Sequence, residues 1–198
     1  MWRYCLITIL LIFLAGCLGG GGVAPTRYYL IDPVDYSSSN ILAVKPLKIE
    51  IIDLQIPQYL ERFHIATRSS ETQLDFSESH QWGENLRKNL LRTMSRNLSK
   101  LLSTVDIGTP LNRSSSQPDY RIQIHIDQFE LDVDNTIKLI ARWQISDLQT
   151  GSLGVFNADL ISQEVIEEKD YDQIVIVMRE LFGKLGLRIS ETILEQEN

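Results

Sequence analysis

The chain has 198 residues, of which 43% are hydrophobic, and 26 acidic against 19 basic side chains give a formal net charge of −7. The length suits one compact domain. The acidic balance argues against nucleic acid as a partner, because phosphates attract basic surfaces, and against membrane attachment through polybasic patches.

The first residues predict a lipoprotein signal peptide over residues 1–16. Arg3 precedes an apolar run from Leu6 to Leu14, and a Leu-Ala-Gly-Cys sequence ends at Cys17. This pattern is typical of a secretory signal peptide and is shorter than the ~20 apolar residues of a membrane span. Leu-Ala-Gly-Cys resembles the lipobox of bacterial lipoproteins. The resemblance implies that Cys17 takes a diacylglyceryl group, that the chain is cut before it, and that the new amine is acylated.

Cys17 would be the only cysteine of the processed chain, because Cys5 lies in the discarded run. The exported protein would then have no disulfide and would depend on its core. Loss of Arg3 leaves 18 basic and 26 acidic residues, a formal charge of −8. Each buried methylene contributes ~0.8 kcal/mol, so a triacylated cysteine anchors stably. An ordinary signal peptide with Cys17 incidental is the alternative.

Residues 17–27 predict a flexible tether behind the lipidated cysteine. They include the run Gly19–Gly22, whose composition gives a flexible linker and which lacks the lysine and threonine of a phosphate-binding loop. Fully extended, the tether reaches roughly 35–40 Å. The domain that follows, residues 28–198, can therefore dock on a protein some distance from the bilayer.

The first half of this domain predicts four short strands and one helix. Alternating or β-branched apolar residues predict strands over residues 28–31, 47–51, 63–67 and 72–76, with Pro57 interrupting the chain between the second and the third.

An apolar stripe at helical spacing predicts the first helix, over residues 86–102. Ser77 or Ser79 is expected to cap it, and Glu84 with Lys88 to form an i,i+4 pair. Its outer side is basic, as in helices that lie on a membrane, but we favour the commoner case of a solvated face on a core helix. The basic residues are Arg87, Arg92, Arg96 and Lys100.

The second half predicts an antiparallel meander. Apolar residues alternate over 121–126, and the phase then slips by one residue over 129–133, which predicts a bulge near Asp127-Gln128. Asp134-Asn135 and residues 149–151 predict turns before strands over 137–145 and 156–160.

A last helix is predicted from Asp170 to Ile189. Gly183 and Gly186 inside it cost ~1 kcal/mol each against alanine, and we expect them to let the helix lie close to the sheet. Two helices and grouped strands indicate an α+β fold: a mixed, largely antiparallel sheet with two helices packed on it, in a single domain.

No pattern in the sequence indicates an active site or a metal site. His64, His80 and His125 belong to no metal-ligand spacing, with His80 expected on the approach to the first helix. No Gly-x-Ser-x-Gly motif is present. Asp132 opens a sequence like a calcium loop, but Ile137 replaces the required glycine and Trp143 the required glutamate. We expect no enzyme activity and no cofactor beyond lipid on Cys17.

Several stretches together resemble the ABC-transport auxiliary lipoproteins of the PqiC/YmbA group. The resemblance covers residues 28 to about 193. At positions 81–86, where the family's usual sequence is Arg-Trp-Ala-Glu-Pro-Leu, this chain departs at Gln81, Gly83 and Asn85. The matching stretches are Tyr28-Tyr29-Leu30, residues 56–62, Ile65-Ala66-Thr67-Arg68, the set Trp82, Glu84 and Leu86, Phe129-Glu130, and Ala141-Arg142-Trp143.

The resemblance implies a non-catalytic lipoprotein that docks on the periplasmic tunnel protein of an MCE-type lipid transport system. The family fold, a sheet with two helices, agrees with the fold predicted above. Leu18 is not the aspartate that retains lipoproteins in the inner membrane, which favours the outer membrane. A lipid carrier with an acyl-chain cavity is the first alternative and a periplasmic hydrolase the second. The sequence leaves a homo-oligomer open.

Residues 57–62 are the candidate partner-binding segment. Pro57 fixes the backbone, and Tyr59 and Arg62 are residue types enriched in interfaces. The competing interpretation is a connection between two strands, with Tyr59 packed against the core.

Overall fold

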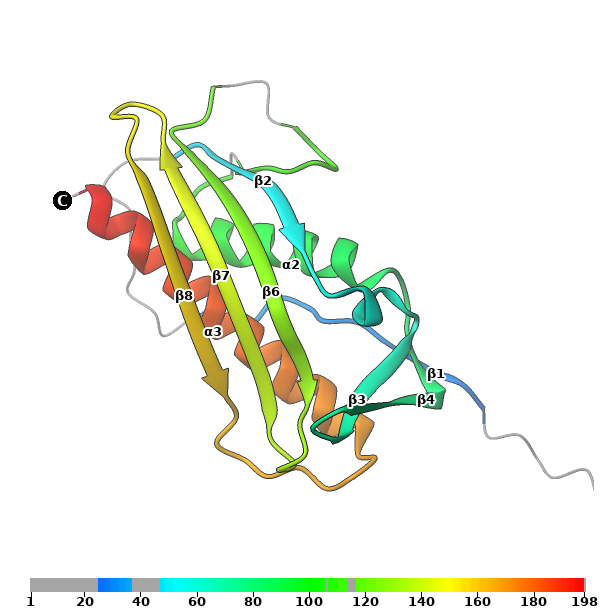
Figure 1. Cartoon of the computed structure of the whole chain (residues 1–198). Helices are drawn as coiled ribbons and strands as arrows, with labels where there is room; N and C mark the ends of the chain where they lie inside the picture. Colours follow the sequence, from blue (N-terminus) through cyan, green and yellow to red (C-terminus); the bar gives the residue numbers. More distant parts are fainter. Residues whose placement is uncertain (1–24, 37–46, 106, 114–116, 198) are drawn as a thin grey trace, which may run out of the picture.

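The computed structural model describes residues 25–36, 47–105, 107–113 and 117–197, so Cys17 and most of the tether lie outside the described residues. Within them, two α-helices cover one face of a mixed eight-stranded sheet (Figure 1). This arrangement confirms the predicted α+β fold. The strands are β1 (Arg27–Tyr29), β2 (Ile49–Gln55), β3 (His64–Ser70), β4 (Gln73–Trp82), β5 (Ile107–Gly108), β6 (Tyr120–Leu131), β7 (Ile137–Asp147) and β8 (Leu153–Ile161); the helices are α2 (Leu86–Leu101), α3 (Tyr171–Glu197) and the short 3-10 helix η2 (Gln58–Glu61).

Strand β6 is the centre of the sheet. On one side it pairs with β7, and β7 with β8, in the predicted antiparallel meander. On its other side β6 pairs in parallel with β2 along its first half and with β3 at its end, where Thr67 lies opposite Leu131. Strand β5 extends the sheet from β2, and β4 and β1 extend it from β3. Alternation alone could not reveal these parallel pairs, because it carries no information on strand direction.

Three of the local irregularities lie where the sequence predicts them. The register of β6 against β7 shifts between Ile126 and Gln128, which is the predicted bulge. Asn135 and Gly151 adopt positive φ values of 60° and 73° in the two predicted turns, a conformation that asparagine and glycine tolerate best.

The start of α2 differs from the prediction. Asn85, and neither serine, caps the helix, by accepting a hydrogen bond from the Lys88 amide. Strand β4 continues to Trp82, so Ser77 and His80 belong to it. Ser77 and Ser79 contact His80 Nδ1 at 3.0 and 3.2 Å. Glu84 pairs with Arg92, two turns on, in place of Lys88.

The core fills the space between the helices and the inner face of the sheet. Ile122, Ile124 and Ile126 of β6 are fully buried there. Phe129 stacks on Phe182 of α3 with ring centroids 6.1 Å apart. Side chains of α2 and α3 complete the same continuous cluster. Burial of this surface supplies most of the favourable free energy of folding.

A segment that we call the strap, residues 31–36, runs from β1 along the two helices (Figure 1). The side chain of Asn89 in α2 bonds both backbone polar groups of Ile31. Ile31 N donates to Asn89 Oδ1 at 2.8 Å, and Asn89 Nδ2 donates to Ile31 O at 3.2 Å. Thr93 donates to the same carbonyl at 2.6 Å, and Val34 N donates to Asn97 at 3.3 Å. The i, i+4, i+8 spacing of the three polar residues places them on one face of α2.

The strap also explains the two glycines of α3, and the expectation about them is wrong. A Cβ atom at Gly183 would lie 2.6 Å from Cγ2 of Val34, and one at Gly186 would lie 3.4 Å from Cβ of Asn97. Both glycines therefore face the strap and α2, and not the sheet. Tyr36 reinforces the contact by donating its hydroxyl to Gly183 O at 2.9 Å.

Candidate functional site

The segment after β2 forms a single turn of 3-10 helix that connects β2 to β3. Pro57 precedes the turn, and its carbonyl accepts the Leu60 amide at 3.0 Å. Leu60 is buried, and Tyr59 is half-buried against the core. Arg62 is exposed and lies over the ring of Phe76, 4.5 Å from its centroid. The side chains of Tyr59 and Arg62 thus both have partners within the chain.

The hydroxyl of Tyr59 points to a buried carboxylate, Glu130 of β6. Glu130 is 0% exposed and accepts four hydrogen bonds. Tyr59 donates to Oε2 at 2.6 Å, as does the Phe129 amide at 3.0 Å. Arg68 of β3 donates to Oε1 through Nη2 at 2.8 Å and Nε at 3.1 Å. One carboxylate therefore joins η2, β3 and β6.

The electrostatics of this cluster favour the protonated forms of Tyr59 and Arg68. Burial, and then the hydrogen bond to Glu130, raises the pKa of the Tyr59 phenol far above its ordinary value. The hydrogen bond to Glu130 raises the pKa of Arg68, although burial opposes it. Four donors occupy the four lone-pair positions of the Glu130 carboxylate. The Glu130 carboxylate is therefore fully hydrogen-bonded within the chain, and the cluster acts as a structural joint.

A second ion cluster lies beside the first, at the turn between β6 and β7. Lys138 pairs with Asp132 and, at 3.3 Å, with Asp134. Burial works against ionisation of Asp132, but hydrogen bonds from Lys138 and the Val133 amide prevail and lower the pKa of Asp132. Hydrogen bonds from Thr136 lower the pKa of Asp134. In the sequence these two aspartates resemble part of a calcium loop, but in the structure both pair with Lys138.

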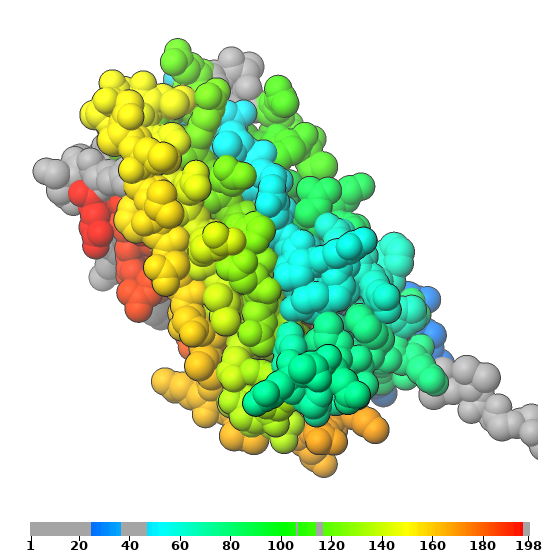
Figure 2. Space-filling model, viewed as in Figure 1, coloured from blue at the N-terminus to red at the C-terminus, as the bar shows by residue number. Residues whose placement is uncertain are grey.

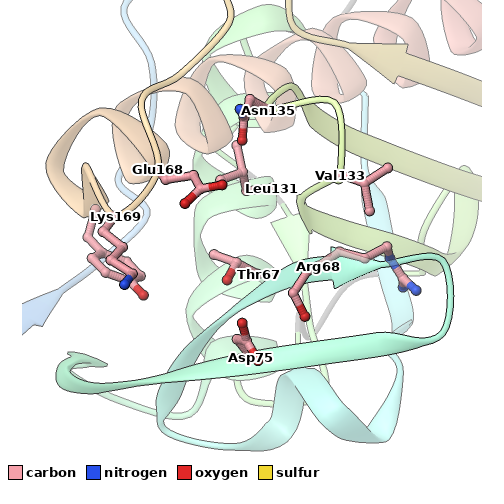
Figure 3. Close-up of a pocket in the computed structure, with 10 residues that line it drawn as sticks. Thr67, Arg68, Asp75, Leu131, Val133, Asn135, Glu168 and Lys169 are labelled. Carbon is pink, nitrogen blue, oxygen red and sulfur yellow. The ribbon is translucent and has the colours of Figure 1, made fainter.

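A polar pocket of about 150 Å³ opens next to these clusters (Figure 3). The β3–β4 hairpin contributes Thr67 and Asp75, the β6–β7 turn contributes Asn135, and the loop before α3 contributes Glu168 and Lys169. This volume holds a few water molecules and is well below the ~300–1,000 Å³ of a small-molecule site. The pocket does not suit an acyl chain.

None of the three histidines lines this pocket, and each has its own partner within the chain. His64 Nε2 contacts Gln81 at 3.2 Å, and His80 stacks on Tyr171 with ring centroids 4.2 Å apart. His125 pairs with Asp127 on the outer face of the sheet at 3.1 Å. Within the described part of the chain, no group of three or more His, Cys, Asp or Glu residues is arranged to hold a metal ion.

The sequence did not reveal the burial of Glu130. Alternation around the β6 bulge places Phe129 and Leu131 inward and Glu130 on the opposite, nominally solvated face. Tyr59 and Arg68 cover that face locally. The only sign of this cluster in the sequence was the family resemblance, because the matching stretches contain Tyr59, Arg68 and Glu130. The structure brings these three residues together.

A family model described as "ABC-type transport auxiliary lipoprotein component" matches residues 28–190. The chain belongs to this family. No curated protein sequence matches it at a significant level. Within the described residues, no helix is long and apolar enough to cross a membrane.

Two solved structures have the fold of this auxiliary lipoprotein. A crystal structure of an uncharacterized protein is 16% identical, covers 85% of this chain and 99% of its own, and superposes with a TM-score of 0.68. Protein XCC0632 from Xanthomonas campestris is 10% identical, with coverages of 87% and 98% and a TM-score of 0.64. At these identities the likeness concerns the fold.

Proposed function

We propose that this protein is a non-catalytic, lipid-anchored subunit that docks on the periplasmic tunnel protein of an MCE-type lipid transport system. Membership of the auxiliary lipoprotein family, over residues 28–190, carries the proposal. The lipobox at Cys17 supplies the membrane anchor, and Leu18 favours the outer membrane. Pro57, Tyr59 and Arg62 remain the candidate partner contacts, with Arg62 the exposed one.

Affinity isolation of the full-length lipoprotein from detergent-solubilised membranes tests the proposal. The tunnel protein is expected to copurify, as identified by mass spectrometry, and tagging that protein is expected to recover the lipoprotein. Arg62→Ala is expected to weaken the copurification. It should not unfold the domain, because Arg62 is exposed. Reciprocal isolations that recover neither protein with the other would contradict the proposed partner.

The packed interior favours this docking role over a lipid carrier. Among the described residues, buried side chains that include Phe129 and Phe182 pack between the sheet and the helices, and the pocket beside Glu168 is too small for an acyl chain. Native mass spectrometry of the delipidated domain separates the two functions. A docking subunit is expected at the mass of the protein alone, whereas phospholipid at near-unit stoichiometry would support a carrier.

A further inference from the structure

Three large apolar side chains are exposed at the corner where β1, the end of β4 and the start of β3 meet. These residues, which we call the corner patch, are Tyr28, Leu30 and Phe63, and they are 68%, 44% and 56% exposed. Strand β1 is the edge of the sheet opposite β8, and Figure 2 shows the blue N-terminal residues and the yellow β8 on opposite sides of the molecule. Apolar residues exposed singly are ordinary, whereas a group of them is a feature of protein and membrane contact surfaces.

The backbone of β4 holds the corner patch together. Trp82 N donates to Phe63 O at 2.6 Å, and the next amide, Gly83 N, donates to Tyr29 O at 2.8 Å. Leu30 lies over Gly83, because a Cβ atom there would lie 3.5 Å from Leu30 Cδ2. Phe63 and the end of β1 therefore flank the same two residues of β4, and backbone hydrogen bonds fix the spacing of the patch.

The core does not use the outward side chains of β1. Arg27 and Tyr29 point inward and donate to Asp172 of α3 at 3.1 and 2.8 Å. Alternate residues of an extended chain face opposite sides, so Tyr28 and Leu30 point outward together. The exposed parts of these two side chains contribute nothing to the interior, and their apolar character calls for an occupant outside the domain.

The charged groups around the corner patch do not oppose an anionic surface. Three acidic residues here each form an ion pair with an arginine, which reduces their repulsion of other anions. Lys88, in the first turn of α2, is exposed. The three pairs are Glu61–Arg87 at 3.2 Å, Asp172–Arg27 at 3.1 Å, and Glu84–Arg92.

The position of Cys17 in the sequence selects the occupant. Only residues 18–27 separate Cys17 from Tyr28, and this length of chain reaches roughly 35–40 Å at most. With lipid on Cys17, the corner patch can never lie farther than this from the bilayer surface. The tether makes contact with the bilayer intramolecular, at an effective concentration on the order of millimolar. Three side chains can then hold a contact that would be weak for a free protein.

We propose that the corner patch inserts among the lipid headgroups of the membrane that holds Cys17. The inference rests on the lipid anchor of the proposed function. Tyr28 has the amphipathic ring that favours a bilayer interface, and Leu30 and Phe63 supply apolar surface. Residues 57–62 border the patch, so a tunnel-protein contact there would lie close to the membrane surface. Strands β7 and β8 lie on the other side of β6 from the patch and face away from the bilayer.

Spin labels on the reconstituted, lipidated protein test this orientation. Tyr28→Cys or Phe63→Cys introduces one free thiol, because Cys17 holds the lipid and Cys5 leaves with the signal peptide. In vesicles of phosphatidylethanolamine and phosphatidylglycerol, both labels are expected to lose most of their collisions with a water-soluble nickel complex and to keep those with oxygen. Leu153→Cys is the matched control, because Leu153 is 60% exposed on β8, and its label should stay accessible to nickel.

A second substitution tests the apolar contact itself. Leu30→Glu in the Phe63→Cys protein is expected to restore access of the nickel complex, whereas Val155→Glu is not. Equal access at positions 28, 63 and 153, in a protein whose mass shows the lipid, would overturn the proposal and leave the anchor intact. Protection that follows protein density at constant lipid composition would assign the patch to a second copy and also overturn it. A mass without lipid would overturn the anchor and this inference together.

Discussion

At the scale of single residues, a buried carboxylate organises the most recognisable part of the family sequence. Glu130 takes hydrogen bonds from Tyr59 and Arg68, which come from η2 and β3. A buried charge is tolerated only when it is paired and hydrogen-bonded, and removal of one partner costs more than the pair contributes. Tyr59 therefore contributes to folding, whatever partner the surrounding surface binds.

Removal of the Tyr59 hydroxyl tests this role. Tyr59→Phe keeps the ring but leaves one lone pair of Glu130 without a donor, so we expect the free energy of unfolding to fall by about 1–3 kcal/mol. Arg62→Ala is the control, because its contact with Phe76 is exposed and contributes about 0.5–1 kcal/mol. Urea unfolding of both variants gives the comparison, and equal losses would argue against the buried joint.

The second ion cluster predicts a dependence on pH. The pKa of Asp132 is lowered in the folded state, so its stabilisation is complete above the ordinary aspartate pKa of about 3.9 and is lost as the pH falls through the lower folded value. Unfolding free energies measured from about pH 6 to pH 2 should fall less steeply in Asp132→Asn than in the wild type. Parallel profiles for the variant and the wild type would refute the assignment.

At the scale of elements, the strap and the two helices fit each other through glycine. Gly183 leaves room for Val34, whose Cγ2 would otherwise lie 2.6 Å from a Cβ atom, whereas Gly186 has ordinary clearance at 3.4 Å. The two glycines are three residues apart in the same helix, and only Gly183 is needed for the contact with the strap.

This difference predicts opposite effects of one substitution. Gly183→Ala forces the branched Val34 side chain to move and should destabilise by about 1–3 kcal/mol. Gly186→Ala should be neutral or stabilising by up to ~1 kcal/mol, because alanine is the better helix former. In a Val34→Ala background the cost of Gly183→Ala should disappear. Thermal unfolding of the four variants tests the pairing, and a cost that persists without the valine would refute it.

The sequence predicted the helices and strands better than it predicted the contacts between them. Both helices, the meander β6–β7–β8 and the bulge near Gln128 follow from periodicity, because side-chain spacing reports which face is buried. The cap at Asn85, the parallel pairing of β2 with β6 and the burial of Glu130 depend on residues distant in sequence. Asn89, Thr93 and Asn97 interrupt the apolar face of α2, and only the strap explains them.

At the scale of the whole molecule, the two faces of the sheet have different surroundings. Among the described residues, the helices and the strap cover the inner face, while no helix covers the outer faces of β7 and β8 (Figures 1 and 2). A docking subunit needs such a division, with one side that builds the core and another that meets partners.

The proposed anchor is tested at this scale by Cys17→Ser. Serine has no thiolate to accept the diacylglyceryl group, so we expect the variant to lose lipid and to leave the membrane fraction or remain unprocessed. Metabolic labelling with palmitate, followed by fractionation, measures both. Labelling at the wild-type level would show that Cys17 is not the attachment site. An unchanged melting temperature of the soluble domain is the control for folding.

The position of the strap also determines where mechanical tension enters the protein. Any anchor N-terminal to β1 pulls first on β1, which pairs with β4 and whose Arg27 and Tyr29 bind Asp172 at the start of α3. The pull acts next on the strap, which Asn89 and Thr93 hold to α2. A pull from the membrane is thus shared by β4 and both helices. Strands β7 and β8 lie on the other side of β6 from β1 and β4, outside this path, so a partner bound there would stay in place when the tether is stretched.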